Sequence, residues 1–585
     1  MKTIKNKAWL IIIIAVSLFI RLWWIEIFPV GITHDEMDYI INAKAIYLTG
    51  RDTSGTWSPL SLTAKSYKTP TAELPSLIMA PFIGPIKLSF RSAKIPYVIA
   101  NTFLIIITSL IVFHFIGFRA AFITGLLFAI NPWSIHFSRT AFEAPLAICF
   151  FLTGLYILLK TKSWKILLTF PFFFLGFFSY HGTKLLFLPF VLVIIMFHYF
   201  TTKGSKSKKP YIVLFLLSLL IFLYFTFSLK YQAAGNRTKE LIFFASNTIS
   251  QVVDYERRAS IPTRVTQIFS NKATHIIKAF TSQYLASVSS TLLFVNGEQR
   301  GAYSTWHHGL FYYIDFILLL IGIIVMANQN KHFFYLLLSL GLIAPLPAAL
   351  SNLGESYVLR AALLFPILII FVSRGISFLI CASGRLSKLS AITFVIVYFI
   401  FLTNFLYLYF YRYPVYGSEG FFFSERILSH YIHRVKNKTK QLVVVSKEPW
   451  FLFEQYLFYS KIYETREIAK EVAQTIQTEE YSYENIKFIF AQTCEEVSTQ
   501  LDKNMTLIIN KDIPCTKFQP STEVPIKIIA NTEDGGWIFK IYNDHLCNNY
   551  STQTYPKPTS IKEYQLSQLD DKLFCNAWIM TTSTP

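Results

Sequence analysis

Three carboxylates fall within four residues near the start of the chain, in the stretch Thr33-His34-Asp35-Glu36-Met37-Asp38. The stretch follows the first long apolar run, so we expect it at the level of the lipid headgroups. A carboxylate that is desolvated on one side can act there as a base or hold a cation. The same residues also fit an ordinary helix start, because Asp and Glu are common after a Thr N-cap. The sequence leaves both interpretations open.

Basic and polar side chains occur at other places that would face the same side of the membrane. Lys68 precedes a proline-containing apolar stretch, where an ammonium could meet a lipid-linked phosphate, or could simply reach the headgroups as an interfacial lysine. Arg139 and Glu143 are four residues apart and could pair on one helix face, or Glu143 could join Asp35 in one site. Further candidates are Arg91, Lys94, Tyr180, His181, Lys184 and Arg360.

These residue types describe a site with carboxylates and cations at the outer membrane surface. Such a site suits a reaction between a lipid phosphate substrate and a polar acceptor. A carboxylate would take a proton from the attacking hydroxyl or amine, and cations would stabilise the departing phosphate. A divalent cation is a candidate cofactor at Asp35, Glu36 and Glu143, although a reaction that releases a single phosphate can run without one. The adjacent His307 and His308 diverge in direction and are weak metal ligands.

Long uncharged runs must position these residues. Of the 585 residues, 53% are hydrophobic and 15% are charged, whereas a soluble domain carries about 25% charged residues. A membrane-spanning helix needs about 20 apolar residues, and fewer where the bilayer thins. We therefore predict an α-helical polytopic membrane protein with about 11 transmembrane helices, near 8–27, 95–116, 119–137, 144–160, 166–180, 184–200, 211–229, 310–327, 333–350, 359–378 and 389–411.

The distribution of Lys and Arg predicts the orientation. With the N-terminus in the cytoplasm, every short loop on that side carries Lys or Arg and none carries Asp or Glu, as cytoplasmic loops do. Counting the apolar residues 72–88 as a span would break this pattern, so we predict a surface helix there. The expected protein is a multi-pass plasma-membrane protein. Its net charge of +20 then reflects topology and anionic lipid, and no nucleic-acid partner is expected.

Three large regions would lie outside: 28–94, 230–309 and a C-terminal domain. We predict a membrane domain over 1–415 and an extracytoplasmic α/β domain over 416–585. Strands are expected at 441–446, 487–491 and 505–509, a helix at 465–478, and a hairpin turn at 531–536 before a further strand. Four cysteines in this domain predict two disulfides of open connectivity, among Cys494, Cys515, Cys547 and Cys575.

At the residues singled out above, the sequence resembles the membrane-embedded glycosyltransferases of the GT-C fold. The branch is the one shared by protein O-mannosyltransferases and lipid A aminoarabinose transferases, and the resemblance covers roughly residues 8–415. The order and spacing of the elements are more specific than any one of them. The elements are Asp35-Glu36, Gly50-Arg51-Asp52, Trp57-Ser58-Pro59-Leu60, Tyr67-Lys68-Thr69-Pro70 (where Thr69 replaces a proline), Arg91, residues 131–144, Ser179-Tyr180-His181, Asn296-Gly297-Glu298 and residues 359–366.

The resemblance implies an activity and a role for each matching residue. Such enzymes take a sugar from a polyprenyl-phosphate donor in the outer leaflet and invert the anomeric centre in a direct displacement. Asp35 would be the base or would orient the acceptor, with Glu36 in support, although Asp38 could share that role. Lys68 and Arg91 would bind the lipid phosphate. Glu143 would be a second acidic site residue, with Arg139 near it, and Tyr180, His181 and Arg360 would complete the substrate site.

Two alternatives belong to other functional classes. A transporter or flippase of lipid-linked sugars should carry ionisable or broken features at mid-membrane, often in repeated halves, and the sequence shows its charges at the outer ends with no repeat. A non-catalytic cell-envelope scaffold could lose Asp35, Lys68 and Glu143, and all three are present. The partners expected of the enzyme are a polyprenyl-phosphate-linked sugar donor, membrane lipid, and a protein, lipid or glycan acceptor.

Overall fold

The computed structural model describes residues 8–63, 65, 71–202, 207–231, 241–242, 246–299, 301–351, 357–382, 384–496, 505–515, 525–550 and 558–581. The chain forms two compact units, each assembled from segments that are distant in the sequence. The first unit comprises Met1–Trp23, Pro59–Pro75 and Tyr97–Leu406, and the second comprises Trp24–Ser58, Ser76–Pro96 and Tyr407–Pro585.

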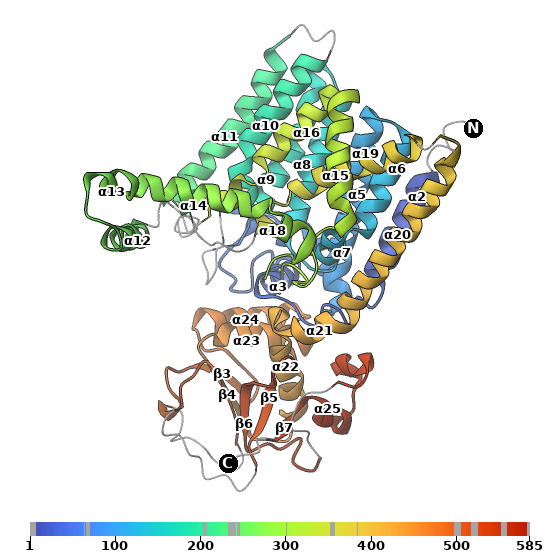
Figure 1. The fold of residues 1–585 in the computed structure, drawn as a ribbon. Helices are drawn as coiled ribbons and strands as arrows, with labels where there is room; N and C mark the ends of the chain where they lie inside the picture. The colour runs from blue at the N-terminus through green and yellow to red at the C-terminus, as the bar shows by residue number, and fades with distance from the viewer. Residues whose placement is uncertain are drawn as a thin grey trace. The chain divides into compact units, whose positions relative to one another are not determined.

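The first unit is a bundle of apolar helices (Figure 1). Phe and Leu pack between neighbouring helices, as where Phe151 stacks on Phe190 with ring centroids 5.0 Å apart. The helices of the bundle are α2 (Ala8–Leu22), most of α5 (Phe90–Phe115), α6 (Phe118–Ile130), α7 (Pro132–Ser138), α8 (Glu143–Lys160), α9 (Phe170–Ser179), α10 (His181–Thr201), α11 (Lys209–Tyr231), α15 (Tyr313–Gln329), α16 (Lys331–Ile343), α19 (Leu364–Ala382) and α20 (Ser387–Tyr407).

Within the described residues, seven helices are long and apolar enough to cross a membrane, or eight if the bent pair α6–α7 is one span. The 60° bend falls at Asn131-Pro132, where the proline cannot continue the hydrogen bonding of α6 and Asn131 caps α7. Three further apolar helices are shorter, at Ala8–Leu22, Ser163–Ser179 and Tyr313–Gln329. Each predicted span coincides with a helix, and the protein is a multi-pass membrane protein; the count of eleven crossings stays a prediction.

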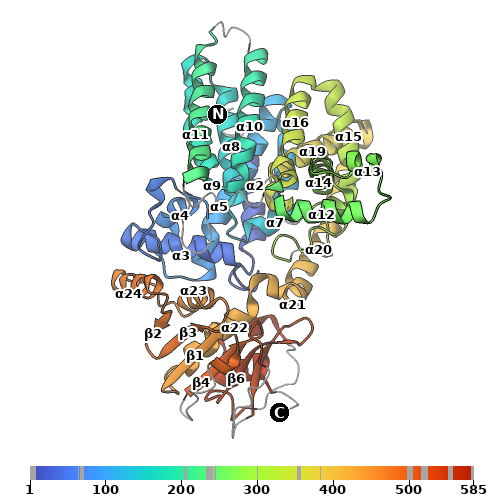
Figure 2. The same cartoon turned by 90° about the vertical axis from the view of Figure 1, so that its left-hand side faces the viewer.

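Residues 246–287 form a projection from the first unit that we call the paddle. It consists of α12 (Ser246–Arg258), α13 (Arg264–Phe269) and α14 (Lys272–Ser287). Thr263 and Asn271 begin the second and third helices by accepting backbone N–H groups. Figure 1 shows the paddle extending sideways from the bundle, and in Figure 2 this side of the bundle faces the viewer. It packs against α17 (Leu346–Ala349) and α18 (Tyr357–Arg360) through α14.

The second unit contains two helices from the first predicted outer region and the C-terminal sheet (Figure 2). The helices are α3 (His34–Thr49) and α4 (Pro75–Ile83), so the predicted surface helix over 72–88 is nine residues long. The sheet has the order β2-β3-β1-β4-β6-β5-β7. β1 runs parallel to β3 and β4, and the other pairs are antiparallel. The strands are β1 (Gln441–Ser446), β2 (Ser482–Tyr483), β3 (Ile486–Phe490), β4 (Met505–Asn510), β5 (Lys527–Ala530), β6 (Trp537–Tyr542) and β7 (Met580–Thr581).

Helices cover this sheet because its strands carry apolar side chains on both faces, as Leu442 to Val445 do in β1. α22 (Phe423–Val435) packs on β5 and β6, and α23 (Pro449–Tyr459) packs on β1 and β3. The predicted helix at 465–478 is α24 (Arg466–Gln477). The predicted hairpin turn joins β5 to β6, with hydrogen bonds from Asn531 N to Gly536 O at 2.8 Å and from Gly535 N to Asn531 O at 3.0 Å.

The four clustered cysteines form two disulfides, Cys494–Cys515 and Cys547–Cys575. This confirms the predicted number and supplies the connectivity. The second bridge ties the loop after β6 to α25 (Asp571–Trp578), across a separation of 28 residues.

Replacing Cys547 and Cys575 together with Ser is expected to lower the free energy of unfolding of the second unit by about 2–4 kcal/mol, because the open chain gains loop entropy when it unfolds. Protease resistance of the C-terminal region under increasing denaturant would measure this. Cys381→Ser, which removes an exposed cysteine of the first unit, is the matched control. Equal resistance of the double variant and the control would show that the bridge adds no stability.

Candidate active site

The acidic stretch begins α3 and is organised by a capping box. Thr33 is the N-cap, and its hydroxyl accepts the Glu36 N–H at 3.3 Å while the Glu36 carboxylate accepts the Thr33 N–H at 3.0 Å. Glu36 is completely buried. The helix-start interpretation of the sequence is therefore correct for Thr33 and Glu36, and the Glu36 carboxylate shapes the start of the helix.

Asp35 and Asp38 have different surroundings. Asp38 is buried and accepts the Asn42 side-chain N–H at 3.0 Å, and Asn42 in turn accepts the Thr53 N–H at 2.9 Å. Asp38 thus fastens α3 to the loop that follows it. The Asp35 side chain is 44% exposed, and it lies in the first turn of α3, where the helix dipole favours an anion. Of the three carboxylates, Asp35 is the one that a substrate can reach.

Two buried cations hold the segment that leads into α3. The Lys94 ammonium donates to the Pro29 carbonyl at 3.2 Å, and the Arg426 guanidinium donates to the Val30 carbonyl at 2.5 Å. Both also lie over the Phe90 ring, at 4.3 and 4.5 Å from its centroid. Burial lowers the pKa of Arg426 to about 10, which leaves it charged at neutral pH. Lys94, a candidate phosphate ligand in the sequence, here has a backbone carbonyl as a partner.

Gly31 lies where this segment passes very close to another backbone. A Cβ atom at this position would meet the Phe421 carbonyl oxygen at 1.9 Å, which no side chain can tolerate without movement of the main chain. The segment 29–32 and the start of α3 are therefore fixed against residues that precede α22.

Gly31→Ala is expected to destabilise the second unit by at least about 1–3 kcal/mol, the usual effect of overpacking, and to displace the start of α3. The unfolding midpoint and the transfer activity proposed below should both fall. Gly536→Ala serves as control, because its Cβ would meet the movable Asp534 side chain at 3.1 Å. A Gly31→Ala protein with wild-type stability and activity would contradict this close packing.

His34 links the acidic stretch to α23. Its ring lies 4.7 Å from the ring centroids of both Trp450 and Phe451, and its Nδ1 is 3.9 Å from the Asp35 carboxylate. Burial opposes a charge on this imidazole, but the neighbouring Asp35 carboxylate, with the charges of Glu454 and Asp38, outweighs it and raises the pKa of His34.

This pairing predicts a pH-dependent contribution to stability. Because the folded-state pKa of His34 lies above the ordinary 6.5, the contribution is fully present below pH 6.5 and is lost as the pH rises through the folded-state pKa. His34→Gln should make the unfolding midpoint depend less on pH between pH 6.5 and the folded-state pKa of His34. His545→Gln, which replaces an exposed histidine, is the control. An unchanged pH profile in His34→Gln would show that the imidazole is not charged in the folded protein.

A further buried ion pair in the second unit was missed in the sequence. The Lys44 ammonium donates to the Gly84 and Ile86 carbonyls at 2.9 and 3.0 Å and lies 2.5 Å from the Glu464 carboxylate. Glu464 also accepts the Leu88 N–H at 2.7 Å. Three segments that are far apart in sequence therefore meet at one lysine.

Arg91, the predicted phosphate ligand of this unit, is accessible. It lies in the first turn of α5, its side chain is 68% exposed, and it stands 3.7 Å from the half-exposed Glu26. An exposed pair at this distance contributes little to stability. The guanidinium can therefore exchange this partner for a phosphate.

The other predicted site residues belong to the first unit. Arg139 is completely buried, and its guanidinium donates to the Ile20 and Arg21 carbonyls at 3.1 and 2.8 Å. These are carbonyls of the last turn of α2, which have no partner within the helix. Arg139 therefore fixes the end of α2, and its predicted place in the substrate site stays a prediction. Glu143 is the first residue of α8 and is buried.

Tyr180 and His181 lie at the turn between α9 and α10. Beside this turn the Lys184 ammonium and the Glu73 carboxylate form a buried ion pair, with N–O distances of 2.6 and 2.8 Å. The Leu74 N–H adds a hydrogen bond to the Phe178 carbonyl at 3.1 Å. Residues 71–75 are thus held at the turn. Lys68, which precedes them, lies outside the described residues.

Arg360 ends the short helix α18 and is half-buried. The N-terminus of this helix is held by Glu298, whose carboxylate is buried and accepts the Val358 N–H at 3.0 Å. The Asn296-Gly297-Glu298 element of the sequence therefore positions the helix that carries Arg360.

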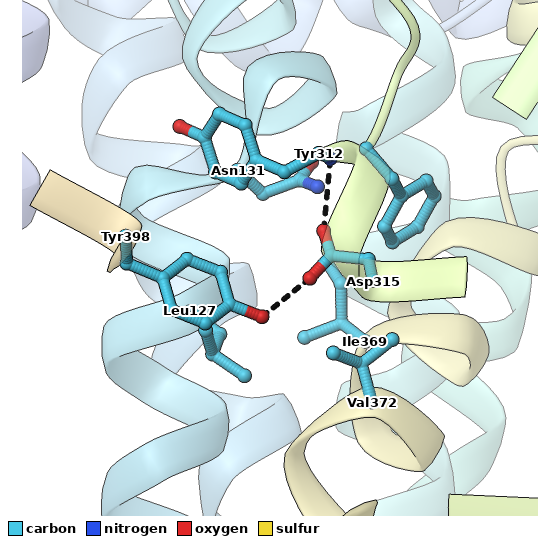
Figure 3. Close-up of a pocket in the computed structure, with 8 residues that line it drawn as sticks. Leu127, Asn131, Tyr312, Asp315, Ile369, Val372 and Tyr398 are labelled. Carbon is cyan, nitrogen blue, oxygen red and sulfur yellow. Dashed lines mark hydrogen bonds between the residues drawn. The ribbon is translucent and has the colours of Figure 1, made fainter. Parts of the chain in front are cut away.

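A small cavity in the bundle surrounds another buried carboxylate, that of Asp315 (Figure 3). Its oxygens accept the Tyr398 hydroxyl and the Tyr312 N–H, the latter at 2.9 Å. The cavity measures about 10 Å³, which is room for about one water molecule. Asp315 caps α15 and joins it to α20, and the cavity is too small for a substrate.

A larger groove of about 790 Å³ lies within the second unit. Its walls come from the residues after α2, the end of the last apolar helix and the segment before α25. None of the predicted site residues lines it, and four of its 13 lining residues are aromatic, namely Trp24, Phe410, Tyr411 and Tyr564. In the part of the chain that the structure describes, no group of three or more His, Cys, Asp and Glu side chains is arranged to hold a metal ion.

Solved structures of two membrane enzymes resemble this chain. One is the archaeal oligosaccharyltransferase AglB from Archaeoglobus fulgidus, in complex with an inhibitory peptide and a dolichol-phosphate; the TM-score is 0.43 and the identity 13%, over 87% of this chain and 70% of that one. The other is ArnT from Cupriavidus metallidurans bound to undecaprenyl phosphate; the TM-score is 0.47 and the identity 11%, over 92% of this chain and 98% of that one. ArnT in the apo state gives 0.45 and 12% over the same shares.

Both are GT-C membrane glycosyltransferases, the class that the sequence resemblance names. With TM-scores below 0.5, these likenesses do not indicate what this chain binds. No protein-family model and no curated protein matches the chain.

Proposed function

We propose that this protein is a glycosyltransferase that moves a sugar from a polyprenyl-phosphate-linked donor to an acceptor at the outer face of the membrane. The observation that carries the proposal is the state of the three carboxylates at the start of α3. Glu36 and Asp38 are buried in structural hydrogen bonds, and Asp35 alone of the three is substantially exposed. A rigid helix start that presents one carboxylate suits a general base.

In the proposed reaction an acceptor hydroxyl or amine attacks the anomeric carbon from the side opposite the phosphate. The new bond forms as the bond from that carbon to the phosphate oxygen breaks, which inverts the anomeric centre and releases the polyprenyl phosphate. The acceptor proton passes to the Asp35 carboxylate. Arg91, in the same unit, and Lys68 are the proposed ligands of the departing phosphate, whose charge they would balance.

The proposed topology places the N-terminus in the cytoplasm, eleven spans in the plasma membrane, and residues 416–585 outside. The two disulfides of the second unit support this placement, because such bonds persist in oxidising compartments. Glu143, Tyr180, His181 and Arg360 stay proposed as further site residues. The divalent cation stays a prediction from the sequence, and the Glu36 carboxylate is already engaged by Thr33.

The test is turnover of a panel of labelled polyprenyl-phosphate sugars by the purified protein in detergent, with and without candidate acceptors. Lipid-dependent release of sugar, with an anomeric configuration in the product opposite to that of the donor, would support the proposal. Retention of configuration would contradict the displacement mechanism. Absence of turnover on every donor, together with movement of the intact lipid-linked sugar across proteoliposomes, would favour the transporter.

A further inference from the structure

The paddle is a folded element with a firm attachment to the first unit. α12 packs on α14, and Lys278 of α14 stands 3.5 Å from Glu256 of α12. The Tyr284 hydroxyl of α14 donates to the Leu342 carbonyl of α16 at 2.8 Å. α14 also packs on α17, so the paddle lies across the bundle at the end where α16 stops (Figures 1 and 2). Its surface is therefore held in a definite place.

This surface carries large apolar side chains with no protein against them. α13 has no buried residue. Phe269 is 72% exposed and Ile261 78%. None of the paddle helices is long and apolar enough to be a span within the described residues, so lipid around a transmembrane helix does not explain the exposure. The exposed apolar set is Tyr255, Ile261, Val265, Ile268, Phe269, Ile277 and Leu285.

Exposed cations surround these apolar side chains. The paddle holds five Lys and Arg residues and two acidic residues, one of which already pairs with Lys278. The orientation of a membrane protein across the bilayer is set by the charges of its short loops, and the region 230–309 is too long to count among them. The four cations outside that pair are exposed on the paddle and can meet another surface. The cations are Arg257, Arg258, Arg264, Lys272 and Lys278.

We propose that the paddle is an interfacial anchor that lies in the outer leaflet, with its apolar side chains below the headgroups and its cations on anionic lipid phosphates. Helices that combine an apolar side with Lys and Arg bind membranes in this way, and the cations give preference for anionic lipid. Figure 1 shows the paddle lying across the bundle helices, the direction that a helix in the plane of the interface requires. The anchor goes beyond the proposed reaction and uses the proposed topology for the choice of leaflet.

Spin-label accessibility in the reconstituted full chain tests the proposal. In a Cys381→Ser background, Cys149 is buried and the other cysteines are in disulfides, so a label added at Phe269→Cys reports one place. Gln267→Cys, exposed on the other side of α13, is the matched control. The label at Phe269 should be several-fold more accessible to oxygen, and less accessible to a water-soluble nickel complex, than the label at Gln267.

Two outcomes would overturn the proposal. Equal access of the nickel complex to both labels would place the paddle in water. That result would fit a surface that docks a protein and has no partner bound. Shielding of the Phe269 label from oxygen as well as nickel would mean that protein covers it.

The lipid charge is tested in vesicles of phosphatidylcholine with and without phosphatidylglycerol. Added phosphatidylglycerol should reduce nickel access to the Phe269 label further. The triple substitution Arg257→Glu, Arg258→Glu and Arg264→Glu should abolish that response. A response that is absent from the parent protein, or that survives the triple substitution, would contradict the role of the cations.

Discussion

Asp35→Asn is expected to lower the rate of sugar transfer by roughly 10²–10⁴-fold, the usual contribution of a general base. The amide keeps the shape of the carboxylate but cannot take the acceptor proton. Because Asp35 is an exposed residue of the first helical turn and Glu36 makes the cap, the variant should fold as the parent does. The rate under saturating donor, and donor binding in the absence of acceptor, would separate lost chemistry from lost binding.

Two matched variants sharpen this result. Glu467→Gln removes an exposed carboxylate of the same unit and should leave the rate unchanged. Glu36→Gln preserves the capping box, since Gln can accept the Thr33 N–H as Glu does, and should cost far less activity than Asp35→Asn. A large loss in Glu36→Gln with full activity in Asp35→Asn would transfer the role of base to Glu36.

Glu73→Gln should reduce the stability of the first unit by about 3–5 kcal/mol, because it leaves the Lys184 ammonium buried without its counter-charge. The side chains of Lys184 and Glu73 are 0% and 3% exposed, so water cannot replace the lost partner. Lys184→Met should have an effect of similar size through the orphaned carboxylate. Both losses of stability would be measured by denaturing the detergent-solubilised variants and monitoring the loss of the monodisperse peak.

The double variant Glu73→Met, Lys184→Met tests whether charge burial is the cause. With no charge left to bury, most of the lost stability should return, as it does when a buried ion pair is replaced by apolar side chains of similar size. The Lys278–Glu256 pair, whose side chains are 76% and 31% exposed, provides the contrast, and breaking it should change stability little. Additive losses in the double variant would mean that the two residues act separately.

The elements that the sequence predicted well are those with a local pattern. Uninterrupted apolar runs such as 211–229 became helices of nearly the predicted length, and Leu442 to Val445 became a buried strand. The turn at 531–536 was also correct, because Asn-to-Gly stretches favour a reversal whatever surrounds them. The predicted span at 119–137 contains a 60° bend at Asn131-Pro132 that the prediction did not include, although the proline indicates such a break.

The contacts that hold the candidate site could not be predicted from periodicity. Lys44 meets Glu464 across 420 residues, and Arg426 meets Val30 across 396. Nothing near either residue in the sequence indicates its partner. The sequence likewise does not indicate that Glu73 pairs with Lys184, 111 residues away. The distinction among Asp35, Glu36 and Asp38 needed side-chain burial, whereas the pattern Thr33-x-x-Glu36 already fitted a capping box.

The most direct test of the central claim is a side-by-side measurement with the parent protein and Asp35→Asn. Both would be reconstituted in one lipid mixture with a polyprenyl-phosphate donor whose sugar carries the label, together with an acceptor on which the parent turns over. We expect label to leave the lipid in the parent, with polyprenyl phosphate appearing in equal amount, and to stay on the lipid in Asp35→Asn even though the donor still binds. Equal release of label by the two proteins would contradict the assignment of Asp35 as the base.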